Sequence, residues 1–176
     1  MPPLETTLAP AQPEDVLELD ELWSFVQCKA SACWVWVALC RRTRQVVSWF
    51  AGACSADSCR QLWDGIPQAY RCAQTYSDFW QAYQRVFGEN HQSVSKETGE
   101  TAHIERWNNT LRQRLARFVR KSLSFSKNDR FHRRNLAVEI IKALPKKILM
   151  LIIVIHRRFK LPLIIPLCHY PNAVIL

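Results

Sequence analysis

The first half of the chain shows the apolar pattern of three consecutive strands. Apolar and polar residues alternate within residues 16–26, residues 33–40 (CWVWVALC) form a continuous apolar run, and a third apolar stretch covers residues 46–51. Alternation with a period of two is typical of a half-buried strand, and a short continuous apolar run is typical of a strand buried on both faces. Because the connections between these stretches are short, we predict an antiparallel meander.

Helical and extended patterns alternate in the next part of the chain. Ser55 has the side chain of a helix N-cap and precedes apolar residues at helical spacing. A strand over residues 73–77, a helix over 79–87, a brief strand over 92–95 and a long helix from Thr101 are expected to follow. This order predicts an α/β fold in which helices flank a mixed sheet, with three antiparallel strands first and parallel strands after them.

Composition divides the chain into three expected parts. Residues 1–15 are rich in Pro and Ala and are predicted to be a flexible leader, residues 16–127 carry the strand and helix patterns, and residues 128–176 form a basic and apolar tail. The tail contains a run of eight apolar residues, 148–155, which is too short for a membrane helix of about 20 residues. We therefore expect no membrane span, and the N-terminus does not have the pattern of a signal peptide.

Positive charge is concentrated in one segment. The net charge of the chain is +9, and the segment from Arg106 to Arg134 alone contains ten Lys or Arg and one acid, Asp129. Ten positive charges minus one negative charge give this segment +9, so the positive and negative charges of the remainder of the chain are equal in number. Such a segment suggests a polyanion partner, with DNA or RNA first, although a solvated basic helix is the simpler alternative.

Glycine and cysteine usage excludes other classes of site. The four glycines form neither of the two common phosphate-binding motifs, G-x-x-x-x-G-K-[ST] and G-x-G-x-x-G. A nucleotide-binding loop is therefore not expected. None of the seven cysteines forms a C-x-x-C motif, and the five-residue spacings fit zinc fingers poorly. Free buried thiols in a reducing cytosol are the favoured interpretation.

Three carboxylates are the candidate catalytic residues. Asp20 lies on the first predicted strand, Asp78 at the end of the fourth, and Glu105 near the start of the long helix. Carboxylates from such elements can converge at a sheet edge and hold two divalent metals about 4 Å apart, as phosphodiester cleavage requires. The chain has fifteen acids, however, and these three could instead be a turn residue, a cap or a partner of the helix dipole.

The helix around Glu105 carries candidate DNA-binding residues. Asn108 shares a helical stripe with Glu105, and positive side chains surround it. The candidates are Arg106, Asn108, Arg112, Arg114, Arg117, Arg120 and Lys121. Trp80 and Trp107 could stack on bases, but core packing is favoured. His103 could assist at a metal or simply face the solvent.

Three sequence blocks resemble a known family. LDELWSFV, TYSDFWQAY and HIERWNNTLRQRLARFVRKSLSFSK resemble, in this order, the DDE transposases of the insertion-sequence-one family, specifically the catalytic part made from the second reading frame. The resemblance spans residues 19–127. It implies an RNase H-like fold, with Asp20, Asp78 and Glu105 as ligands of two Mg²⁺ (or Mn²⁺) ions. It also implies cleavage at the element ends and attack of the freed 3′-hydroxyl on target DNA.

The resemblance also implies partners and a location. These are DNA ends and target DNA, further copies of the chain, and the product of an upstream reading frame that supplies a DNA-binding region, all in the cytoplasm at the bacterial or archaeal nucleoid. Residues 128–176 are expected to depart from the family, as out-of-frame translation would, with loss of its last helix. An alternative reading is therefore a catalytically inactive DNA-binding remnant or regulator.

Overall fold

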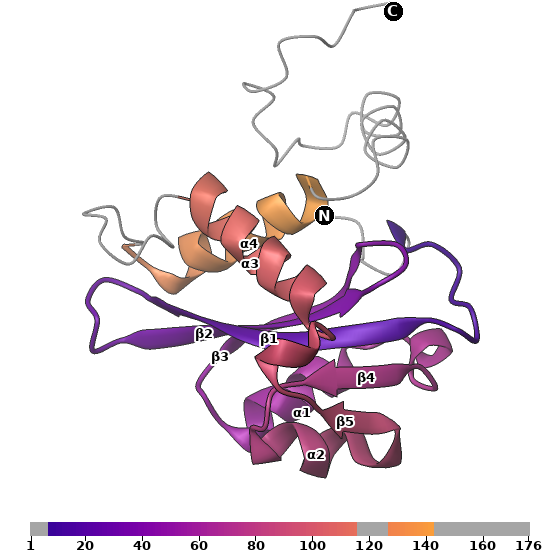
Figure 1. Ribbon diagram of the computed structural model, residues 1–176. Coiled ribbons are helices and arrows are strands. Elements are labelled where there is room, and N and C mark those ends of the chain that lie inside the picture. Colours follow the sequence, from indigo (N-terminus) through magenta and orange to yellow (C-terminus); the bar gives the residue numbers. More distant parts are fainter. Residues whose placement is uncertain (1–6, 116–126, 143–176) are drawn as a thin grey trace, which may run out of the picture.

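A five-stranded mixed sheet with helices on both faces forms the protein (Figure 1). The computed structural model describes residues 7–115 and 127–142. The strands are β1 Val16–Phe25, β2 Ala32–Cys40, β3 Val46–Gly52, β4 Gln74–Ser77 and β5 His91–Ser93. The α-helices are α1 Ala56–Asp64, α2 Gln81–Phe87, α3 Ala102–Arg114 and α4 Asp129–Lys142. Short 3₁₀ turns cover Gln68–Tyr70, Gly88–Asn90 and Lys96–Thr98.

The predicted α/β class and the order of elements up to α3 are confirmed. The strands lie in the order β3-β2-β1-β4-β5. The first three strands form the expected antiparallel meander, and β4 and β5 add to it in parallel. Because the strand that begins the meander also pairs with β4, the central position in the sheet belongs to β1.

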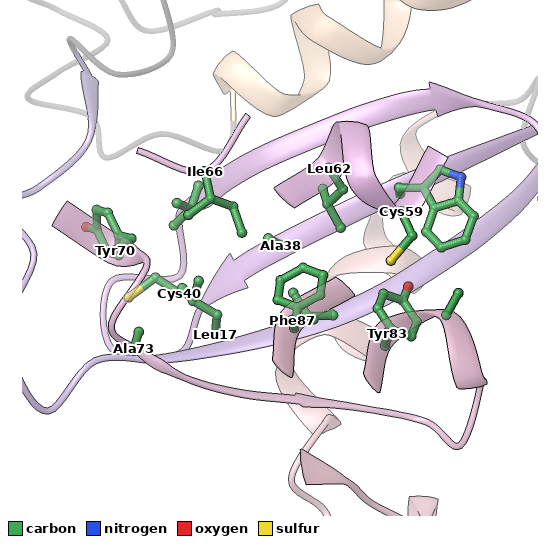
Figure 2. Close-up of a cluster of buried hydrophobic side chains, with 14 residues drawn as sticks. Leu17, Ala38, Cys40, Cys59, Leu62, Ile66, Tyr70, Ala73, Tyr83 and Phe87 are labelled. Atoms are coloured by element: carbon green, nitrogen blue, oxygen red, sulfur yellow. The ribbon is translucent and has the colours of Figure 1, made fainter. Parts of the chain in front are cut away.

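Alternation along β1 separates two hydrophobic layers. Leu17 and Leu19 belong to the layer covered by α1 and α2. Figure 2 shows Leu17 there together with Tyr83 and Phe87 of α2. Leu22 points to the opposite layer, where it meets side chains of α3 and α4. Successive side chains of a strand lie on opposite faces, so Glu18 and Asp20 are on the same face as Leu22. This face is the one that α3 and α4 cover (Figure 1).

Local capping explains where the first two helices begin. Ser55 caps α1 as predicted, since its Oγ accepts a hydrogen bond from the Ser58 N–H at 3.3 Å. The second helix was expected from residue 79 but begins at Gln81. Asp78 Oδ1 accepts the N–H of Trp80 at 3.1 Å, so residues 78–80 form a turn that places the Asp78 carboxylate between β4 and α2.

Helix α4 packs on the same sheet as the helices before it. Leu136 and Ile140 are buried with Val35, Val37 and Ile104 in one core cluster. Helix α4 lies beyond residue 127, where we placed the end of the catalytic part, and it contributes apolar side chains to the core. The apolar run 148–155 lies outside the described residues.

Replacing Leu136 with Ala should lower the free energy of unfolding by about 2–5 kcal/mol, because Leu136 is fully buried and its truncation leaves a cavity. Phe131→Ala is the matched control, since Phe131 lies on the same helix but is 53% exposed, and its loss should cost about 0.5 kcal/mol or less. Urea denaturation of the two variants measures both values. Equal effects would mean that α4 does not stabilise the sheet.

The described residues show which cysteines are buried and whether any helix has the length of a membrane span. Six cysteines lie in it and all are free. Cys33, Cys40 and Cys59 are buried as expected, whereas the expectation of burial is wrong for Cys28, Cys54 and Cys72. Within residues 7–115 and 127–142, no helix is long and apolar enough to cross a membrane.

Candidate active site

Asp20 lies in the middle of β1, on the face that α3 covers. Asn108 of α3 donates a hydrogen bond from Nδ2 to Asp20 Oδ2 at 2.6 Å. The second carboxylate oxygen, Oδ1, accepts the backbone N–H of Glu21 at 2.9 Å. Both oxygens of Asp20 therefore have a fixed partner, one from its own strand and one from the helix above it.

Asp78 follows the last residue of β4, next to β1. The parallel register pairs Leu17 with Thr75 and Glu18 with Tyr76. Continued by two residues, this register places Asp78 beside Asp20 at the end of the shared ladder. Paired residues of two parallel strands keep a constant offset in sequence number. Asp20 and Asp78 have the same offset as Glu18 and Tyr76, so they lie side by side.

Glu105 lies in the first turn of α3. Its Oε1 is 3.3 Å from the Thr101 hydroxyl, which donates to it. Ile104 and Leu111 are buried in the core and set the rotation of the helix. Asn108, one turn after Glu105, is thereby directed at Asp20.

The charges of Asp78 and Glu105 act on the buried Asp20 carboxylate. The pKa of Asp20 is raised to about 6, mainly by burial and to a smaller extent by the negative charges of Asp78 and Glu105, while the hydrogen bonds from the Glu21 N–H and Asn108 oppose the rise. Sequence analysis named these three residues, and the fold brings them within electrostatic reach. In the described ranges, however, no three His, Cys, Asp or Glu side chains are arranged so that they could hold a metal ion.

The donor chemistry at Asp20 nevertheless fits a hard divalent cation. All the candidate ligands are carboxylate oxygens, which Mg²⁺ and Mn²⁺ prefer. Asn108 Oδ1 is buried and has no hydrogen-bond partner among residues 7–115 and 127–142, so one acceptor at the site is unsatisfied there. A cation would stabilise the charged form of Asp20, which burial and, to a smaller extent, the charges of Asp78 and Glu105 disfavour. Binding would require the three carboxylates to draw closer than they are here.

Glu21 is an additional acid that the sequence analysis missed. It faces the opposite layer, where the Tyr83 hydroxyl donates to Glu21 Oε2 at 2.7 Å. Burial raises its pKa to about 7, and the charges of Asp78 and Asp20 contribute. The signal in the sequence was the adjacent pair Asp20 and Glu21, because strand alternation places neighbouring acids on opposite faces.

Glu18 is the second residue that the sequence analysis missed. Its carboxylate is completely buried and accepts the backbone N–H groups of His103 and Ile104, each at 2.9 Å. Arg41 Nε at 2.8 Å and His103 Nδ1 at 2.6 Å complete its surroundings. His103, which we considered for a metal or for solvent, is bonded to Glu18 instead. A glutamate inside an apolar strand was the available signal.

The candidate DNA-binding residues occupy different settings. Arg106 and Arg114 are exposed on α3, and Arg112 is partly buried. Asn108 is 5% exposed and bonded to Asp20, which places it at the acids and not on the outer face. Three further candidates lie outside the described residues: Arg117, Arg120 and Lys121.

The two tryptophans near the acids, Trp80 and Trp107, pack against the core, the role that the sequence favoured over base stacking. The ring of Trp80 lies 5.0 Å from that of Trp36, centroid to centroid, and 5.8 Å from that of Tyr83. Trp107 packs against the layer that contains Ile104 and Leu136. Base stacking is therefore not the role that this structure indicates for either side chain.

Comparison with known proteins adds to this geometry. The family model of the IS1 transposase matches residues 16–144. The insertion element iso-IS1n protein InsB of Shigella dysenteriae is 33% identical over 127 residues, which is 72% of this chain and 95% of that protein. The IS1 protein InsB of Shigella flexneri is 37% identical over 116 residues, 65% of this chain and 86% of the relative. No solved structure is significantly similar to the chain.

The extent of the family match corrects one expectation. We expected the chain to depart from the family at residue 128, but the match continues to residue 144 and so includes α4. Helix α4 lies within the matched segment and packs on the sheet through Leu136. From its matching segment and its relatives, the chain belongs to the IS1 transposase family of DNA-processing enzymes.

Proposed function

We propose that this protein catalyses metal-dependent DNA strand cleavage and strand transfer during transposition of an insertion sequence, with Asp20, Asp78 and Glu105 as the DDE residues. The observation that carries the proposal is the electrostatic coupling of Asp78 and Glu105 to the buried Asp20 carboxylate. Two neighbouring carboxylates whose charges help to raise the pKa of Asp20 form, together with it, a site that favours positive charge. The meander followed by parallel strands supports an RNase H-like fold.

The chain's own residues would hold the carboxylates in place for two Mg²⁺ or Mn²⁺ ions. Asn108 orients Asp20, the Trp80 N–H orients Asp78, and the Thr101 hydroxyl orients Glu105. When bound, such cations activate a water or a 3′-hydroxyl nucleophile and stabilise the leaving oxygen. Oriented ligands reduce the entropy that must be lost when the site closes around its ions and its substrate.

The basic segment would hold the DNA beside these acids. Arg106 and Arg114 are exposed on the helix that carries Glu105, so a phosphate bound there lies on the same element as the site. Transposition joins two element ends to a target, which favours an assembly of several copies. A DNA-binding region from an upstream reading frame, and action in the cytoplasm at the nucleoid, belong to the same proposal.

The proposal is tested with the full-length chain and a supercoiled plasmid carrying the ends of its element. We expect nicking in Mg²⁺ or Mn²⁺, none in EDTA, and none with Asp78→Asn or Glu105→Gln. Asp64→Asn is the control because Asp64 is an exposed acid at the end of α1. Salt-sensitive DNA binding without cleavage in any metal would instead identify a DNA-binding remnant.

A further inference from the structure

The beginning of α3 is capped by a residue from the central strand and not by its own sequence. Thr101, the residue at the N-cap position, makes no side-chain capping hydrogen bond. The N–H groups of His103 and Ile104 donate instead to Glu18 Oε2, each at 2.9 Å. The first N–H groups of a helix have no partner within the helix, so a buried helix start needs an acceptor from outside. Glu18 supplies that acceptor, and its negative charge also complements the helix dipole.

The position of Glu18 connects the two elements that carry candidate catalytic acids. Glu18 precedes Asp20 by two residues on β1 and therefore shares its face of the sheet. Its two backbone partners immediately precede Glu105 on α3. One turn further along α3, Asn108 donates to Asp20 at 2.6 Å. These two links, a turn apart, fix both the distance and the rotation of α3 relative to β1.

Arg41 keeps the buried Glu18 carboxylate in place and neutralises its charge. Its Nε donates to Glu18 Oε1 at 2.8 Å, and its Nη2 donates to Glu100 Oε2 at 2.7 Å. Glu100 lies in the segment just before α3, so Arg41 ties that segment to the same carboxylate. The guanidinium also lies over the Tyr76 ring, 5.3 Å from its centroid. A buried carboxylate with these partners has little freedom to move, because leaving them would uncover an unpaired charge.

We infer that Glu18 is a positioning residue for the transposase reaction, which sets the place of Glu105 relative to Asp20 and thereby the affinity of the acid site for divalent cations. The inference rests on the proposed function. Glu18 does not act on the substrate, and its hydrogen-bond partners within the described residues are Arg41, His103 and Ile104, not the three acids. Its effect passes through the backbone of residues 103 and 104 to Glu105.

Asp15 provides a matched control for the loss of a buried ion pair. It is 1% exposed and accepts from Arg42 Nε at 2.6 Å and from Arg42 Nη2 at 2.9 Å. Its remaining partners are the Gln12 N–H and the Cys40 thiol, so none of the partners described here lies on α3. Glu18 and Asp15 thus share burial and an arginine from the β2–β3 turn, and they differ in contact with the helix of Glu105.

The experiment compares Glu18→Gln and Asp15→Asn in the full-length protein. An amide at position 18 keeps the size of the side chain but removes one oxygen acceptor, so it cannot satisfy all four donors. We expect Glu18→Gln to weaken Mn²⁺ binding, measured by electron paramagnetic resonance, by about 10- to 100-fold. Hydrogen exchange should become faster at the amides of His103 and Ile104. Asp15→Asn should lower the melting temperature while both of these measurements stay at wild-type values.

The outcomes distinguish a failure of the positioning role of Glu18 from a failure of the proposed function. If wild type binds Mn²⁺ and cleaves DNA but the two variants have equal Mn²⁺ affinity, the positioning role is wrong and the proposed function stands. If wild type neither binds Mn²⁺ nor cleaves, both are wrong. Glu18→Asp serves if the glutamine variant does not fold, because it keeps the charge but shortens the link by one methylene. It should weaken Mn²⁺ binding in the same direction, and wild-type affinity would refute the positioning role.

Discussion

Replacing Asp20 with Asn should reduce strand cleavage on the order of 10³-fold or more and at the same time make the metal-free protein more stable. Activity falls because an amide cannot replace a carboxylate ligand, and loss of several kcal/mol of transition-state stabilisation corresponds to this factor. Stability rises because the folded protein holds Asp20 at a pKa of about 6, raised by burial and by the neighbouring acids. Above pH 6 the charged carboxylate opposes folding, at a cost on the order of 1–3 kcal/mol.

The measurement combines plasmid nicking with thermal denaturation in EDTA at pH 7.5. Asn can still accept the hydrogen bond from Asn108 Nδ2, so the link between β1 and α3 is preserved in this variant. The sign of the stability change separates the proposal from the simple alternative. If Asp20 were only a structural partner of Asn108, its replacement would leave cleavage unchanged or would lower the melting temperature.

Divalent metal affinity should fall as the pH is lowered through about 6. Protons and cations compete for Asp20, whose pKa of about 6 lies well above the ordinary value for an aspartate. We expect Mn²⁺ affinity to be nearly constant above pH 7 and to decrease by about tenfold per pH unit below 6. A titration followed by electron paramagnetic resonance between pH 5 and 8 measures this dependence. Constant affinity over the whole interval would contradict the assignment of Asp20 as a ligand.

The same raised pKa values determine how the metal-free protein responds to acid. Between the unfolded and the folded pKa, the native state binds more protons, so the contributions of Asp20 and Glu21 make stability increase as the pH falls from about 7 towards 4. His91 has a lowered pKa through burial and acts in the opposite direction below its ordinary value. The stability difference between Asp20→Asn and wild type isolates the Asp20 contribution. It should be largest above pH 6 and should vanish near pH 4.

The candidate site shows how separate roles are assigned to adjacent residues of one strand. Glu18, Asp20 and Glu21 lie within four positions of β1, yet their surroundings differ completely. Glu18 accepts hydrogen bonds from the start of α3, and Asp20 accepts one from the middle of α3. Glu21 accepts a hydrogen bond from Tyr83 on the opposite face of the sheet. A single strand in the centre of the sheet can therefore hold the helix, present a candidate ligand and place a further acid in the second layer.

Local patterns in the sequence were sufficient for the elements and for the choice of candidate acids. Period-two alternation identified β1, the apolar run CWVWVALC identified β2, and Ser55 identified the start of α1. These signals are short-range, because they arise from side-chain direction and from hydrogen bonds within a few residues. The acids at 20, 78 and 105 were selected by their places on these elements and by the resemblance to a family to which the chain indeed belongs.

Only the tertiary structure decided which residues support those acids. Glu18 meets Ile104, and Asn108 meets Asp20, across separations of 86 and 88 positions, and Leu136 of α4 joins β2 in one core. Such contacts depend on the packing of α3 and α4 over one face of the sheet, and no pattern within a local window encodes their partners. By itself the sequence determined the strands, the first three helices and the identity of the candidate acids. The fold determined their spacing, the raised pKa of Asp20 and the buried carboxylate that holds α3, because these follow from distances between segments far apart in the chain.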